Sequence, residues 1–101
     1  MSSRLYPYKK TVTPVAGIVS FNTIDIRGLV HALIVSPLTS TTKWKMTITN
    51  NDDVVVYKKG IVVGNWVDRR GLSLHGIYTV LISDATRDEA IKFRLNYEEL
   101  Q

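Results

Sequence analysis

Few residues of this chain have the type and spacing that a catalytic or metal-binding site requires. Its two histidines, His31 and His75, are far apart, and each falls in or beside an expected β-strand. A zinc site needs a full set of nitrogen or sulfur ligands, and the chain has no cysteine and no third histidine. Asp52 and Asp53 follow two asparagines, but this segment does not match an EF-hand calcium loop and is typical of a turn. We expect no metal ion and no other cofactor.

Catalytic motifs are not found either. Gly60 and Gly64 are not followed by the Lys-Ser or Lys-Thr pair of a phosphate-binding loop, and no long helix is expected after them. The Gly-x-Ser-x-Gly motif of serine hydrolases does not occur. The carboxylates gather at turns and at Glu98 and Glu99, whereas glycoside hydrolysis needs a pair of them about one site. The chain is therefore not expected to be an enzyme.

One segment mixes aromatic and basic residues, as the binding sites for single-stranded nucleic acids do. In it Trp66, Arg69 and Arg70 lie close in sequence to Lys58 and Lys59. An exposed Trp66 could equally bind carbohydrate. Residues 51–101, however, balance seven Lys and Arg against eight Asp and Glu, so nucleic acid is not the expected partner. A small binding module for carbohydrate or single-stranded nucleic acid stays open as the alternative function.

The basic excess lies in the first half of the chain, where six Lys and Arg stand against one acid. Residues 1–14 contain two prolines and alternate little, so we expect an extended basic arm there, with a short edge strand at 9–12. These charges could form a solvated surface, or the arm could dock on an acidic partner, either protein or nucleic acid. Its tyrosines could anchor that partner or pack on their own domain. The candidate partner-binding residues of the arm are Arg4, Tyr6, Tyr8, Lys9 and Lys10.

Alternation of apolar and polar residues defines the elements that must position these groups. Residues 91–97 alternate strictly, and residues 77–82 are largely apolar on both faces. We therefore expect a final β-hairpin in which the strand at 77–82 is the more central one in its sheet. Residues 43–58 are expected to form another hairpin around the Asn-Asn-Asp-Asp turn. Trp44 alternates with Met46 and Ile48 and is expected in the core.

The whole pattern contains seven or eight short strands and no convincing helix. It predicts an all-β fold, a single antiparallel β-sandwich of jelly-roll or Ig-like type over residues 15–101. A five-stranded OB-type barrel is the main competitor. The length of 101 residues fits one domain. Without cysteine, signal peptide or membrane span, the sequence predicts a soluble chain that folds in a reducing cytoplasm and is made without export.

The order of segments along residues 24–99 resembles that of small β-sandwich virion proteins of tailed bacteriophages, which decorate or cement the capsid or complete the neck and tail. The landmarks are strand and turn segments, none of them catalytic. They are Asp25–His31, Val35–Thr42, the strand Trp44–Ile48 with the turn that follows it, Leu72–Val80 and Ser83–Glu89.

The resemblance implies a non-enzymatic structural protein of a virion, most specifically a capsid decoration or cement protein, made in the host cytoplasm and located in the virion. Its expected partners are capsid or other virion proteins and further copies of itself, with a trimer as the favoured homo-oligomer. No membrane partner is expected. After the arm, Trp66, Arg69 and Arg70 are the second choice for partner contacts.

Overall fold

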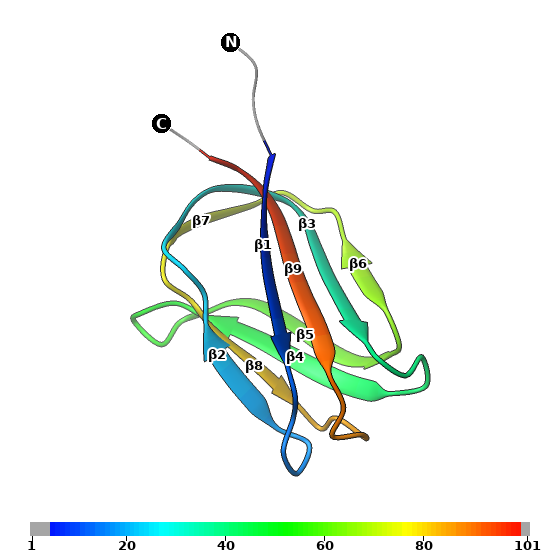
Figure 1. Ribbon diagram of the computed structural model, residues 1–101. Helices are drawn as coiled ribbons and strands as arrows, with labels where there is room; N and C mark the ends of the chain where they lie inside the picture. The colour runs from blue at the N-terminus through cyan, green and yellow to red at the C-terminus, as the bar shows by residue number, and fades with distance from the viewer. Residues whose placement is uncertain (1–4, 100–101) are drawn as a thin grey trace.

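The computed structural model describes residues 5–99, and within them the chain forms two antiparallel β-sheets packed as a sandwich (Figure 1). The expected all-β sandwich is confirmed. One sheet has the order β1-β9-β3-β6, with β7 also paired to β3, and the other has the order β2-β8-β4-β5. The strands are β1 (Leu5–Val12), β2 (Val19–Asn22), β3 (Ile26–Pro37), β4 (Lys43–Thr49), β5 (Val55–Val63), β6 (Trp66–Asp68), β7 (Leu72–Gly76), β8 (Thr79–Ser83) and β9 (Ile91–Glu99).

The core lies between the sheets and is built from one face of each strand. Alternate residues of β9, β4 and β8 point inward, and Phe93, Trp44 and Val80 are each at most 1% exposed. The Trp44 indole N–H donates to the Gly64 carbonyl oxygen at 2.8 Å, so this buried polar group has a partner. The expected burial of Trp44 and the expected hairpin of β4 and β5 are both confirmed.

The expected final hairpin is wrong. β8 pairs with β2 and β4, whereas β9 pairs with β1 and β3, so the two strands lie in opposite sheets. Both strands still turn an apolar face toward the same core, which is all that alternation specifies. The connector between them contacts the loop before β2. There the Asp88 carboxylate accepts hydrogen bonds from the backbone N–H groups of Ala16 and Gly17, each at 3.0 Å.

The N-terminal segment is an edge strand of the first sheet. β1 is antiparallel to β9 along its whole length, from Leu5 opposite Glu98 to Val12 opposite Ile91. The edge strand expected at residues 9–12 thus begins already at Leu5. An arm separate from the sandwich is not confirmed. Arg4 lies outside the described residues. The domain boundary after residue 14 stays a prediction.

No helix of the described residues is long and apolar enough to cross a bilayer.

Candidate functional site

The outer side of the first sheet carries a group of basic residues from two neighbouring strands. Lys9 of β1 is paired with Arg94 of β9, and Lys92 lies two residues before Arg94 on the same side of β9. All three residues are exposed, while the alternate residues Phe93 and Leu95 point into the core. We call Lys9, Lys92 and Arg94 the cationic face. The alternation of β9 places two of these charges, and the pairing with β1 adds the third.

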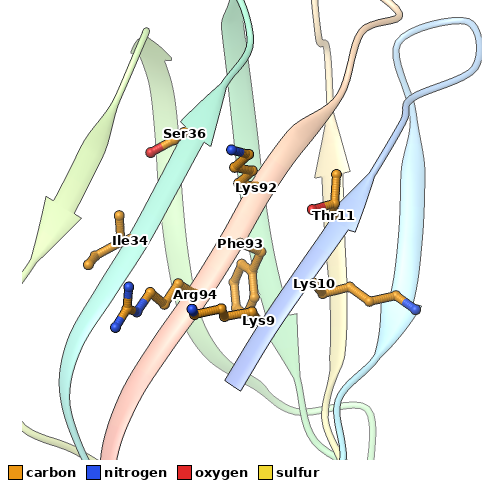
Figure 2. A pocket seen from close by; sticks show the side chains of 8 residues that line it. All are labelled: Lys9, Lys10, Thr11, Ile34, Ser36, Lys92, Phe93 and Arg94. Carbon is orange, nitrogen blue, oxygen red and sulfur yellow. The ribbon is translucent and has the colours of Figure 1, made fainter. Parts of the chain in front are cut away.

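The cationic face borders an open hollow of about 420 Å³ that extends from β1 across β9 to β3. Figure 2 shows the side chains of Lys92 and Arg94 directed toward β3, where Ser36 and Ile34 lie. Register explains this arrangement, because Arg94 is opposite Ile34 and Lys92 is opposite Ser36. The amine of Lys10 points away from the three cations, toward β2 (Figure 2).

The charges of this face are not neutralised within the described part of the chain. The ion pairs found there are Arg27–Asp25, His31–Glu98, Lys45–Asp84 and Arg70–Asp68. None of them involves the cationic face. Arg94 Nε donates to Asn96 Oδ1 at 2.9 Å, which orients the guanidinium but leaves its charge uncompensated. The face therefore attracts an anion.

Tyr6 and Tyr8 lie on the inner side of β1, away from the cationic face. The ring of Tyr8 is 6.3 Å from that of Phe93 in an edge-to-face arrangement, and Tyr8 packs against the core. The ring of Tyr6 is 5.9 Å from that of Tyr97. Burial raises the pKa of the Tyr8 hydroxyl. Of the two readings of these tyrosines, packing on their own domain is the one that these contacts favour.

The segment around Trp66 forms a hydrogen-bonded network between the edges of the two sheets. The Trp66 indole N–H donates to the Tyr57 hydroxyl oxygen at 3.1 Å, and this hydroxyl donates to the Asp68 carboxylate at 2.9 Å. Lys59 Nζ lies 3.9 Å from the centroid of the Trp66 ring. Trp66 is half-buried and packs against the core, so a base or a sugar could stack on this ring only after Lys59 moved.

Arg70 belongs to the same network. Its Nη2 donates to Asp68 Oδ2 at 2.8 Å, and its backbone N–H donates to Asp68 Oδ1 at 2.9 Å. The hydrogen bonds from the Arg70 side chain hold the pKa of the Asp68 carboxyl well below its usual range. Because Arg70 is committed to this carboxylate, the exposed cations of this segment that stay outside the network are Arg69 and Lys58.

The sequence-predicted partner residues therefore do not form one site. Lys9 lies on the cationic face, the two tyrosines lie inside the β1 edge, and Trp66 lies on β6 at the other edge of the sheet order. Lys92 and Arg94 were not among the candidates. The alternation of residues 91–97 indicates that both side chains point outward, but the pairing of β9 with β1 could not be deduced from that pattern.

Ser73 and His75 are the described residues that come nearest to a catalytic pair. Ser73 Oγ lies 3.4 Å from His75 Nε2 on β7, and both residues are exposed. No ion pair among residues 5–99 gives His75 the acidic partner that a serine nucleophile's base normally has. No group of three or more His, Cys, Asp or Glu residues in the same range could hold a metal ion.

No protein-family model matches this chain, and no curated protein matches its sequence. The solved structures that are similar in fold include Arthrobacter globiformis T6 isomalto-dextranase complexed with panose, with a TM-score of 0.42 and 19% identity over 88% of this chain and 18% of that one. They also include infectious bursal disease virus strain Gt, with a TM-score of 0.38 and 12% identity over 94% of this chain and 32% of that one.

A third similar structure is the carbohydrate-binding module CBM36 in complex with calcium and xylotriose. Its TM-score is 0.35, with 13% identity over 98% of this chain and 93% of the module. The present chain spans less than a third of the viral chain and less than a fifth of the isomalto-dextranase. With viral and carbohydrate-binding neighbours both present, these comparisons carry no argument for one function over the other.

Proposed function

We propose that this chain is a non-enzymatic structural protein of a phage virion, most specifically a capsid decoration or cement protein. In this proposal it binds a larger assembly through the cationic face. The observation that carries the proposal is that Lys9, Lys92 and Arg94 lie together on the outer side of one sheet and form no ion pair within residues 5–99. The phage assignment itself rests on the resemblance of residues 24–99 to small virion proteins of tailed bacteriophages.

A sheet face suits a docking role of this kind. The backbone of β9 is paired on both sides, with β1 and β3, so its outward side chains are held in a fixed pattern. Because the backbone of this surface is already ordered, binding costs little backbone conformational entropy. The sequence suggested a docking role for an extended arm, and this proposal gives that role to β9 and its neighbour β1.

The proposed partners are capsid or other virion proteins together with further copies of the chain, and the proposed location is the virion. Closed symmetry is the common outcome when identical subunits associate, and we propose a trimer because the resemblance favours it. The solution mass of the full chain, measured by light scattering at two concentrations, tests this. A trimer or other closed ring that is independent of concentration would support the proposal.

The alternative function, a binding module for single-stranded nucleic acid or carbohydrate, is tested separately. It needs an accessible Trp66 ring, and Lys59 Nζ lies 3.9 Å from the centroid of that ring. If the chain were a monomer and bound single-stranded DNA or xylooligosaccharides with an affinity lost on Trp66→Ala, the alternative would replace the virion proposal.

A further inference from the structure

The three charges of the cationic face have a regular spacing. Lys92 and Arg94 lie two positions apart along one strand, which places their Cα atoms about 7 Å apart. Lys9 faces Arg94 across the strand pair, about 5 Å away. An extended chain repeats its side chains on one side with the same spacing of about 7 Å. Carboxylates at alternate positions of an extended peptide would therefore match Lys92 and Arg94.

The chemistry beside these charges distinguishes a peptide from a nucleic acid. Sequence-tolerant binding of single strands combines basic residues with aromatic rings on which the bases stack. Phe93, the one aromatic residue that lines the hollow, is 1% exposed and points into the core. On the other side of Arg94, Ile34 is half-buried, and its cross-strand neighbour Val67 is 44% exposed. These aliphatic groups can contact aliphatic side chains of a peptide.

The edge of β1 does not favour strand addition as the way to bind such a peptide. Pro7 has no N–H to donate to an added strand, and Lys9 and Lys10 on an edge strand oppose pairing with another chain. The partner would instead lie across the face of the sheet. There the N–H groups of the terminal guanidinium nitrogens of Arg94 can donate to a partner, because they make no hydrogen bond to any described residue. Only Nε donates within the chain, to Asn96.

We propose that the cationic face binds an extended acidic peptide segment of a partner protein, whose alternate carboxylates pair with Lys92 and Arg94 while Lys9 contacts a further carboxylate. This inference rests on the proposed function, because it names the partner chemistry of the same face. A carboxylate received by the Arg94 guanidinium would form charge-assisted hydrogen bonds.

The test is fluorescence anisotropy of the full chain with a labelled peptide in which Glu alternates with Ser, at low and at physiological ionic strength. We expect binding that weakens as salt rises. Arg94→Gln and Lys92→Gln should each weaken it roughly fivefold, the effect of an ion pair at the upper end of the exposed range. Lys43→Gln, the same charge change on an exposed residue of β4 in the other sheet, is the matched control and should leave the affinity unchanged.

Three outcomes would overturn the inference. They are absence of peptide binding, equal losses in Arg94→Gln and Lys43→Gln, and tighter binding of single-stranded DNA of matched charge than of the peptide. DNA binding that Arg94→Gln weakens would assign the face to phosphate groups. Circular dichroism shows whether each variant keeps the fold. A closed ring in light scattering together with failed peptide binding would leave the proposed function standing and remove only this partner.

Discussion

At the residue scale, Asp68 is the side chain whose ionisation matters most for stability. Its carboxylate is only 9% exposed and accepts hydrogen bonds from Tyr57 and from both the side chain and the backbone of Arg70. Tyr57 belongs to the second sheet and Asp68 to the first, so the network links the two layers at one edge. A buried carboxylate with this many donors is stabilised in its ionised form.

Stability should therefore fall as acid protonates this carboxylate. The pKa of Asp68 in the folded chain lies below its value of about 3.9 in the unfolded chain. Between these two values the unfolded chain binds more protons, so the free energy of unfolding decreases as the pH drops below about 4. Asp68→Asn should lose about 1–2 kcal/mol at pH 7 and show a flatter acid limb. Urea titrations of both proteins from neutral pH down to about pH 2 measure this.

The exposed turn residue Asp52 supplies the control for that prediction, since no ion pair among residues 5–99 involves it. Asp52→Asn should leave the acid limb as in the parent chain. Should Asp68→Asn show the same pH dependence as the parent, Asp68 would not be the group responsible.

At the scale of the elements, the pairing of β3 with β9 depends on a close backbone approach. A Cβ atom on Gly28 would lie 2.2 Å from the Glu98 carbonyl oxygen, a backbone atom that cannot move aside without shifting β9. The same strand pair has a register shift between Val30 and Ala32, so that His31 has no residue opposite it on β9, as in a β-bulge. No local sequence pattern shows which backbone comes near Gly28, so this close approach could not be predicted from the sequence.

Two glycine substitutions test this close approach. Gly28→Ala should lower the free energy of unfolding by about 1–3 kcal/mol through overpacking. Gly60→Ala, on β5, is the matched control, because a Cβ there meets no atom within 4 Å. Its effect should stay within about 0.5 kcal/mol. Thermal and urea unfolding of both variants give the comparison, and equal stabilities would contradict the close contact.

At the scale of the whole molecule, the last strand of the described chain completes the first sheet. β9 lies between β1 and β3, and it contributes Ile91, Phe93 and Leu95 to the core. The first and last strands of the described chain are thereby neighbours. A pairing between the two ends of the sequence incurs the entropic cost of loop closure before its contacts form, so we expect it to depend on the rest of the sandwich.

A chain ending at residue 90 should therefore not fold cooperatively. Its first sheet would lack the central strand, and β1 would have no partner. We expect loss of the sigmoidal urea transition and of protected backbone amides, measured by fluorescence and hydrogen exchange. A cooperative transition in this truncated chain would contradict the central role of β9.

The same topology affects how the docking role is tested. Removing residues 1–10 would delete most of β1 and uncover the edge of β9, so a lost interaction could reflect a damaged sandwich. Substitution of single exposed cations on the cationic face avoids this problem. For that reason the peptide experiment uses Arg94 and Lys92.

The sequence by itself determined the all-β class, the burial of Trp44 and the β4–β5 hairpin, because alternation and turn residues are local properties of the chain. Only the tertiary structure decided that β8 and β9 belong to opposite sheets and that β1 pairs with β9. The cationic face followed from that second pairing. Alternation specifies which side of a strand is buried, whereas the choice of neighbouring strand depends on the packing of the entire sandwich.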